Sequence, residues 1–347
     1  ILGEILSCLG NAGIPDERIT LFNATGTHRM NTPEELDGML GSSIARRYRI
    51  VQNVCDAADL HREVGATSRG TPVRILGSFL DCDVRIATGF IEPHFFAGYS
   101  GGGKAVVPGL AHLETILANH SAAHMDHPRA TWDVTEGNPL WQELDEAAAF
   151  ADPVFLVNVT MTSAQEVTGV FAGGRREAHR AGVAAARATA TVAVDREYDI
   201  VVTSTAGHPL DLNLYQAVKG MSAAARVVRD GGEIIVAAEC WDGIPEHGLF
   251  AELITGAASA EELLEELRAS PEPRRDAWQA HILALIARRA RVTLVSTGLP
   301  PGSFESPLVG LAGSVEEALE GAATRLGRAP AVCVLPDGPL VIPTRGS

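Results

Sequence analysis

Short runs of β-branched and apolar residues alternate with helical patterns along almost the whole chain, and this alternation limits the fold more than any other feature. Strands are predicted at 18–22, 83–87 and 153–160, and an alanine-rich helix at 175–189. Strands that alternate with helices usually pair in parallel, with the helices packed on the faces of the sheet. The sequence therefore predicts an α/β fold.

The pattern starts again near residue 195, which indicates a second domain. Further strands are predicted at 199–203, 233–238 and 292–296, with a turn at 207–209. A chain of 347 residues is long enough for two globular domains. We expect an N-terminal domain at 1–192 and a C-terminal domain at 193–347, each with a mainly parallel sheet flanked by helices. The end of the chain, from about residue 333, is expected to pack back on the first domain.

Charge and cysteine content argue against several classes of protein. The 28 Lys and Arg residues against 43 Asp and Glu give a formal charge of −15, whereas a nucleic-acid partner requires clustered cations. The five cysteines form no CxxC pair, as is typical of a reduced cytoplasmic protein. No apolar run approaches the roughly 18 residues of a membrane span, and no leader peptide is recognisable. We expect a cytoplasmic protein without a membrane partner. Because the chain begins at Ile1, we also expect native residues upstream.

A glycine-rich segment between a histidine and a lysine is the clearest candidate for chemistry. From His94 to Lys104 the sequence is HFFAGYSGGGK. Such a backbone can lie against a ligand while the flanking imidazole and amine react. The segment also contains the GxxxxGK pattern of phosphate-binding loops, which would indicate an ATPase module. In such loops the next residue is Ser or Thr and a helix follows, but here Ala105 and then Val-Val-Pro-Gly follow. A purely structural glycine turn is the third alternative.

Several histidines are candidates for proton transfer or metal binding. His120 falls on the apolar stripe of a predicted helix, with Leu113, Ile116 and Leu117, so it should face inward as a core residue or a metal ligand. A zinc site shared with His124 would lack the glutamate of HExxH. His28 lies in a loop between a strand and a helix, where functional residues concentrate. Two histidines on opposite faces of one substrate could equilibrate a stereocentre.

A helix expected from Leu214 supplies candidates in the second half. Gln216 and Lys219 are three residues apart, so they share a face near the helix N-terminus, which favours anions. An amide and an ammonium there suit a carboxylate, although a solvated first turn is an equal alternative. In open α/β sheets, ligands bind at the carboxyl ends of the strands. We therefore expect the site in a cleft between the domains.

Taken together, these segments resemble the nickel-pincer lactate racemase family of 2-hydroxy acid racemases and epimerases. The matching segments are ATGTHR at 24–29 with TPEEL at 32–36, PHFFAGYSGGGK at 93–104 through Pro108-Gly109, Asn119-His120, and YQAVKG at 215–220. They occur in order and span both predicted domains. Members of this family normally carry an Asp-x-Thr-Arg-Pro segment upstream, which the present chain does not contain.

The resemblance implies a cofactor and a role for each candidate. The cofactor is of the pyridinium-3,5-bisthiocarboxylic acid mononucleotide type, with nickel bound through sulfur, carbon and sulfur, and it is made by dedicated cofactor-synthesis proteins. By similarity, His28 and His94 are the acid/base pair and His120 is the nickel ligand. Lys104 would attach the cofactor covalently through a thioamide, beside Ser100, Gly101, Gly102 and Gly103. The substrate would be held by Tyr215, Gln216 and Lys219.

The implied reaction is an internal redox cycle on a 2-hydroxy acid. One histidine takes the hydroxyl proton while the C2 hydrogen moves as hydride to the cofactor, and a planar 2-keto acid results. Hydride and proton then return to the other face. The substrate would be lactate or another 2-hydroxy acid, such as malate or a sugar acid.

Overall fold

The computed structural model describes residues 1–208, 210–245, 248–270 and 273–345. Of the turn predicted at 207–209, Pro209 lies outside the described residues. The first half contains α1 (Leu2–Asn11), β1 (Thr20–Asn23), α2 (Pro33–Leu40), α3 (Ser42–Arg47), β2 (Arg49–Gln52), β3 (His61–Ala66), β4 (Pro72–Leu76), α4 (Gly77–Leu80), β5 (Ile86–Phe90), β6 (Pro93–His94), β7 (Gly98–Tyr99), α5 (Leu113–Asn119), α6 (Ala122–Met125), α7 (Pro139–Ala149), β8 (Phe155–Met161), β9 (Val167–Gly174) and α8 (Arg175–Ala190), with 3₁₀ turns η1 (Asp16–Arg18), η2 (Ala58–Leu60) and η3 (Gly102–Ala105).

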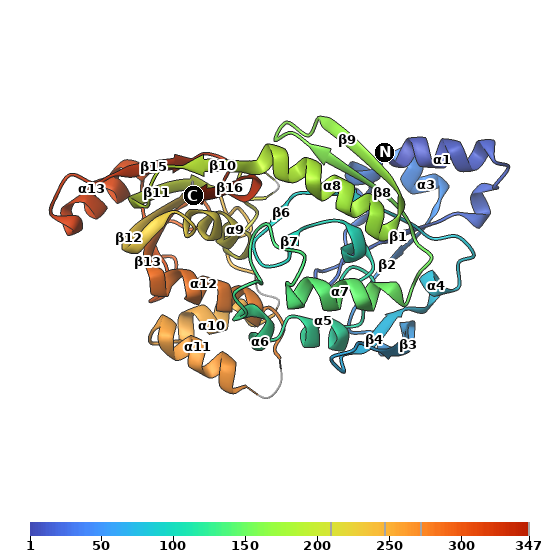
Figure 1. Cartoon of the computed structure of the whole chain (residues 1–347), viewed down its shortest axis with the longest axis horizontal. Coiled ribbons are helices and arrows are strands. Elements are labelled where there is room, and N and C mark those ends of the chain that lie inside the picture. Colours follow the sequence, from blue (N-terminus) through green and yellow to red (C-terminus); the bar gives the residue numbers. More distant parts are fainter. Residues whose placement is uncertain (209, 246–247, 271–272, 346–347) are drawn as a thin grey trace.

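The second half continues the alternation of strands and helices (Figure 1). It contains β10 (Thr191–Val194), β11 (Tyr198–Ser204), α9 (Leu214–Ala224), β12 (Val228–Ala237), α10 (Phe250–Gly256), α11 (Ala260–Ala269), α12 (Ala277–Arg289), β13 (Ala290–Val295), β14 (Gly310–Ala312), α13 (Val315–Leu326), β15 (Val332–Leu335), η4 (Gly338–Leu340) and β16 (Ile342–Arg345). The predicted α/β class is confirmed.

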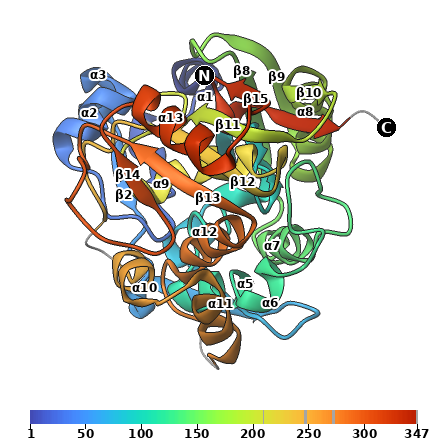
Figure 2. The same ribbon diagram turned by 90° about the vertical axis from the view of Figure 1, so that its left-hand side faces the viewer.

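The second half is built on one five-stranded parallel sheet. Its strand order is β14-β13-β12-β11-β15, and every pairing in it is parallel. Alternate residues of the strands point to opposite faces. Ile200 and Ile235 therefore pack under α13, whereas Val201 and Ile234 belong to the core beneath α9. Figure 2 shows α13 on one side of the sheet and α12 on the other. Because the strands are parallel, the loops after their carboxyl ends meet at one edge.

The strands of the first half fall into smaller sheets. β1 pairs with β2 in parallel, as β5 does with β8, whereas β3–β4, β6–β7 and β8–β9 are antiparallel pairs. Short connections explain the antiparallel pairs, because a parallel crossover needs a dozen or more residues. Helix α8 covers one face of the β5–β8–β9 sheet (Figure 1). The last strand, β16, pairs in parallel with β10, which crosses the predicted domain boundary.

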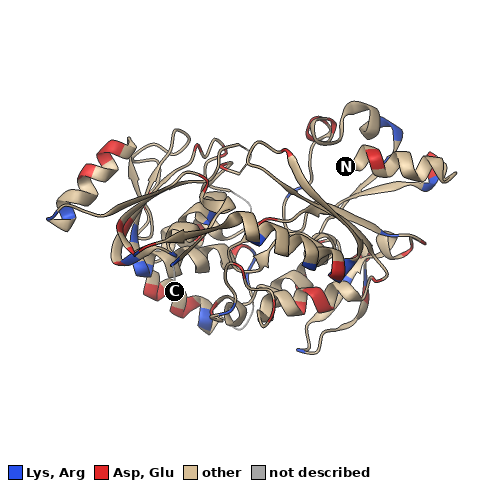
Figure 3. Cartoon of the chain, turned by 45° about the horizontal axis from the view of Figure 1, so that its top comes forward, with Lys and Arg blue, Asp and Glu red and all other residues tan. Residues whose placement is uncertain are grey.

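Local sequence signals account for several helix ends. Thr32 caps α2 by accepting a hydrogen bond from the backbone N–H of Glu35, and the Glu35 side chain accepts one from the backbone of Thr32. The local sequence TPEE at 32–35 is the signature of such a capping box with proline at the first helical position. Acidic and basic side chains are interspersed over the described chain (Figure 3). Among the described residues, no helix is both long enough and apolar enough to cross a bilayer.

Candidate active site

A cleft of about 490 Å³ lies between the two halves and collects most of the predicted site residues. Its walls include His28, His94, Ser100, Gly101, Lys104, His120, Tyr215, Gln216 and Lys219. Residues from four separate sequence segments therefore meet at one place. Gly102 and Gly103 of the glycine loop are buried and do not line the cleft.

The glycine loop is fixed from behind by polar side chains of β8 and α8. The backbone N–H of Gly102 donates to Oδ1 of Asn158 at 2.8 Å, and Nε2 of His179 is 2.9 Å from the carbonyl oxygen of Ser100. Gly102 has a φ of 59°, and a Cβ there would lie 2.7 Å from the His179 ring. This position therefore requires glycine. Gly102 therefore contributes to the backbone conformation of the loop and does not contact the cleft.

The same geometry bears on the phosphate-loop alternative. Lys104 lies within the short 3₁₀ turn η3, further turns follow it, and the next α-helix begins only at Leu113. A phosphate-binding loop runs directly into a helix, whose N-terminus holds the anion. The structure does not provide that helix, so the GxxxxGK match is incidental.

Phe96 is the central contact of the site, although the sequence analysis did not single it out. Its ring lies 4.5 Å from the His94 ring and 5.5 Å from the His120 ring, and Nζ of Lys104 is 5.8 Å from its centroid. Asn138 donates a 2.8 Å hydrogen bond to the carbonyl oxygen of Phe96 and so fixes its backbone. Three predicted site residues thus pack around one buried aromatic ring.

His94 and His120 carry their ring protons on opposite nitrogens. Nδ1 of His120 is 3.1 Å from the carbonyl oxygen of Ile116, which can only accept, so Nδ1 carries the proton and Nε2 keeps a lone pair. In His94, Nδ1 accepts from the backbone N–H of Ala97 at 3.3 Å, so the neutral ring carries its proton on Nε2. His120 can therefore donate a lone pair to a metal, whereas the neutral His94 ring can donate a hydrogen bond from Nε2.

Burial keeps both rings neutral. Desolvation, followed by the charge of Lys104, lowers the pKa of His120 to about 3. Desolvation also holds the pKa of His94 well below its usual value, and Lys104 and Lys219 add to the effect. His120 is buried as predicted, with 8% of its surface exposed. His28 is exposed on the loop after β1, at the rim of the same cleft.

Lys104 and Lys219 face the cleft from different halves and share one acidic neighbour. Burial, followed by the charge of Lys219, lowers the pKa of Lys104 to about 7. Burial also lowers the pKa of Lys219. Glu92 lines the cleft and its charge acts on both amines, while its own pKa is raised by burial. The sequence analysis did not identify Glu92.

The lysine content of the sequence supports an unusual role for these two amines. Lys104 and Lys219 are the only lysines in the 347 residues, and every other basic residue is arginine. Arginine stays protonated and cannot act as a neutral amine near pH 7, whereas a buried lysine can. Both lysines of the sequence therefore line the cleft. This count was available from the sequence and would have strengthened the prediction.

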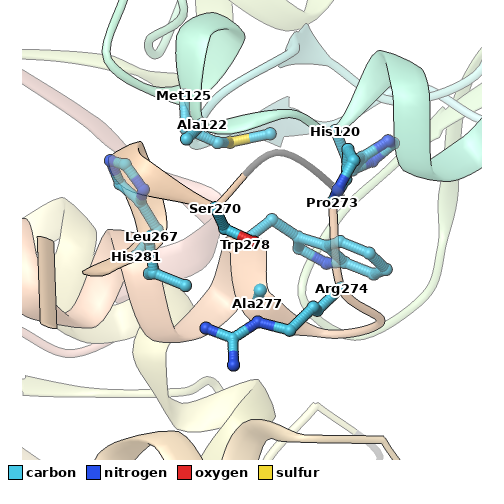
Figure 4. Close-up of a pocket in the computed structure, with 10 residues that line it drawn as sticks. All are labelled: His120, Ala122, Met125, Leu267, Ser270, Pro273, Arg274, Ala277, Trp278 and His281. Carbon is cyan, nitrogen blue, oxygen red and sulfur yellow. The ribbon is translucent and has the colours of Figure 1, made fainter. Parts of the chain in front are cut away.

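The second half presents its candidates from the first turns of α9. The Asn213 side chain caps this helix by accepting from the backbone N–H of Gln216 at 3.1 Å. Trp278 donates a 2.8 Å hydrogen bond to the hydroxyl of Tyr215, and its ring centroid is 5.0 Å from that of His120. Figure 4 shows His120 and Trp278, from the two halves, beside a small cavity of about 20 Å³. Trp278 has no local sequence signal that would have identified it.

The zinc alternative is not supported by the position of His124. Nε2 of His124 faces the buried Glu143, at 3.5 Å, and Nδ1 is 2.7 Å from the carbonyl oxygen of Asn119. Both ring nitrogens are thereby engaged away from the cleft wall. Within the described ranges, no group of three or more His, Cys, Asp or Glu side chains could hold a metal by itself.

Comparison with known proteins agrees with this geometry. The lactate racemase N-terminal domain matches residues 1–133, and the lactate racemase C-terminal domain matches 194–342. The chain is 36% identical over 327 residues to a lactate racemase of Lactiplantibacillus plantarum and 34% identical over 326 residues to one of Thermoanaerobacterium thermosaccharolyticum. Each match covers 93% of this chain and 76% of the relative.

Solved structures give the same result. The lactate racemase apoprotein from Thermoanaerobacterium thermosaccharolyticum superposes with a TM-score of 0.93 at 32% identity, covering 99% of this chain and 82% of that one. A Thermotoga maritima protein shares the fold at 18% identity, with a TM-score of 0.76 over 98% of this chain and 88% of that one. The chain therefore belongs to the lactate racemase family and is an isomerase of the racemase class.

Proposed function

We propose that this enzyme interconverts the enantiomers of a 2-hydroxy acid, lactate first among them, with a nickel-pincer nucleotide attached at Lys104. The observation that carries the proposal is the meeting of His28, His94, Lys104 and His120 with the α9 residues around one cleft. Lactate is the first candidate because both curated relatives and one of the two solved structures are named lactate racemase.

The donor groups of the cleft fit such a cofactor. Nickel binds imidazole nitrogen and soft sulfur, and Nε2 of His120 offers one neutral imidazole lone pair. A metal with a single protein ligand takes its remaining ligands from a bound organic group or from water. A nucleotide that binds nickel through sulfur and carbon would provide them. The residues present therefore fit the group.

Lys104 fits the role of attachment point. An amine forms a thioamide only in its neutral state, and a pKa of about 7 leaves a large neutral fraction at neutral pH. Ser100 and Gly101 line the cleft beside it. We propose that dedicated proteins synthesise the cofactor and supply it to this lysine. We also place the enzyme in the cytoplasm, because its five cysteines are free thiols, the state that a reducing compartment maintains.

The side chains divide the work of the reaction between the two halves. Gln216 and Lys219 project from α9 into the cleft and would hold the substrate carboxylate by charge-assisted hydrogen bonds, with Tyr215 beside them. In this scheme His94 exchanges a proton with the substrate oxygen, which requires its ring to alternate between the neutral and the doubly protonated form. His28, at the rim, is the second proton carrier in this scheme. When bound, the nucleotide supplies the carbon that accepts hydride from C2 and returns it.

The aromatic wall of the cleft has a separate task. Phe95, Phe96 and Trp278 line it and exclude water from the space around His94 and His120. Exclusion of water strengthens electrostatic interactions and protects a reactive keto acid from side reactions.

Racemisation in heavy water tests the proposed function. Protein from a host that makes the cofactor is incubated with enantiopure L-lactate in D₂O, and the configuration and C2 isotope content of lactate are followed. Hydride return predicts racemic lactate that keeps hydrogen at C2. Racemisation with deuterium at C2 would contradict the hydride mechanism, and no racemisation by nickel-loaded protein would contradict lactate as substrate.

A further inference from the structure

The chemistry proposed for the cleft does not use His124, yet this side chain is part of a buried polar network beside His120. Its Nδ1 lies 2.7 Å from the carbonyl oxygen of Asn119. A carbonyl oxygen only accepts, so Nδ1 of His124 is the donor. The carbonyl of Asn119 belongs to the same planar peptide unit as the backbone N–H of His120. His124 therefore fixes the peptide group that joins Asn119 to His120.

That peptide is held at both ends. The backbone N–H of His120 donates to the carbonyl oxygen of Ile116 at 2.9 Å, and the ring Nδ1 of His120 donates to the same oxygen. At the other end the hydrogen bond from His124 fixes the carbonyl of Asn119. With both ends of the peptide and one ring nitrogen engaged, the remaining Nε2 of His120 has a defined direction.

A buried carboxylate faces the other ring nitrogen of His124, which can donate to it when the ring carries a proton on both nitrogens. Glu143 on α7 has a fully buried side chain, and its Oε2 lies 3.5 Å from Nε2 of His124. Asn119 donates to the same oxygen at 3.4 Å, while Thr67 and Thr71 donate to Oε1 at 2.9 and 2.7 Å. A buried carboxylate is costly unless it is hydrogen-bonded in this way. Figure 1 shows α6, which carries His124, beside α5 and α7.

We propose that His124, with Glu143 packed behind it, is a positioning residue that holds His120 in the orientation needed to bind the metal. This inference rests on the proposed function, because it assigns His120 as the nickel ligand. A carboxylate, backbone carbonyl or water that orients the ring of a metal-ligating histidine is a common arrangement, and loss of such a partner typically weakens metal binding 10- to 100-fold. Here the link passes through a peptide group rather than directly to the ligand ring.

Two substitutions of His124 distinguish a role in orienting His120 from a role in packing alone. The amide nitrogen of Asn occupies nearly the place of Nδ1 in histidine, and that of Gln nearly the place of Nε2. His124→Asn therefore keeps the donor to Asn119 and loses the link to Glu143, whereas His124→Gln does the reverse. The exposed His127 provides the matched control His127→Asn. Thr67→Val removes one hydrogen bond from the far oxygen of Glu143 and controls for stability.

Nickel release from cofactor-loaded protein to a chelator is the main measurement, with the absorption spectrum of the bound nickel and the thermal midpoint of unloaded protein as separate readouts. We expect His124→Gln to release nickel roughly 10- to 100-fold faster than wild type and to change the spectrum. His124→Asn should recover most of the slow release, His127→Asn should match wild type, and Thr67→Val should lower only the thermal midpoint.

The outcomes distinguish this inference from the proposed function. Equal release from wild type, His124→Asn and His124→Gln would overturn the positioning role alone, as would equal acceleration in both His124 variants with equal loss of stability. Absence of nickel from loaded wild type would overturn the proposed function and this inference together.

Discussion

The two halves of the cleft hold their functional side chains by different means. In the first half, His94 and Lys104 lie on irregular backbone that is fixed by buried polar contacts, such as those of Asn138 with Phe96 and Asn158 with Gly102. In the second half, Gln216 and Lys219 lie on the regular helix α9, which is fixed by apolar packing. Leu214, Ala217, Val218 and Met221 of that helix are fully buried.

The use of polar contacts in the first half and apolar packing in the second matches the precision that each half requires. A group that transfers a proton or binds a metal must be placed within fractions of an ångström, and directional hydrogen bonds provide that placement. A group that holds a carboxylate tolerates more variation, and nondirectional packing is enough. If this is correct, loss of a polar contact in the first half should affect catalysis most, whereas loss of packing under α9 should affect stability most.

The largest effect is expected from the histidines themselves. His94→Ala and His28→Ala should each lower racemisation by roughly 10²- to 10⁴-fold, the usual contribution of a general acid or base. Nickel content should stay at the wild-type level, because neither residue is the proposed ligand. Chiral analysis of the product and elemental analysis of the protein measure the two quantities. Loss of nickel from either variant would contradict the separation of proton transfer, assigned to His28 and His94, from metal binding, assigned to His120.

A packing change in the second half should show the opposite pattern. Met221→Ala removes a fully buried side chain beneath α9, and we expect it to lower the free energy of unfolding by about 2–5 kcal/mol. Turnover well below the melting temperature should change little. Denaturant unfolding together with initial rates at 25 °C tests this. A large fall in kcat without loss of stability would contradict the expectation that packing under α9 serves stability rather than catalysis.

A polar change in the first half provides the counterpart. Asn158→Ala leaves the N–H of Gly102 without its acceptor, which costs about 1–3 kcal/mol. We expect slower racemisation and slower cofactor attachment, with a smaller loss of stability than in Met221→Ala. Unchanged kinetics in this variant would show that the glycine loop does not depend on its polar support.

The smallest and most specific effect concerns the link between the halves. Burial and the charge of Lys219 lower the pKa of Lys104 to about 7, so the reactive neutral amine should increase as pH rises through about 7 and then level off. Lys219→Met removes a positive charge, which should move that midpoint upward while burial keeps it below the usual lysine value. Acylation rates of unloaded protein across pH, followed by peptide mass, measure the midpoint cleanly because only two lysines are present. An unchanged midpoint would show that the two amines do not interact.

The same contrast explains what the sequence could predict. The capping box at Thr32, the inward face of His120 and the shared face of Gln216 and Lys219 depend on neighbours within one helix, so local spacing was sufficient. Asn158 and Gly102 are separated by 56 positions, and Trp278 meets His120 across the cleft. Such contacts have no local pattern, which is why Asn158, Glu92 and Trp278 were not predicted. The antiparallel pairs of the first half join strands that follow one another directly, and the short connections between them were not interpreted as hairpins.

The most direct test of the central claim is the mass and metal content of protein made in a host that synthesises the cofactor. The account predicts a mass increase confined to the peptide that contains Lys104, together with one equivalent of nickel. His120→Ala should keep the added mass and lose the nickel, whereas Lys104→Arg should lose both. An unmodified Lys104 in nickel-free wild-type protein from the same host would contradict the account.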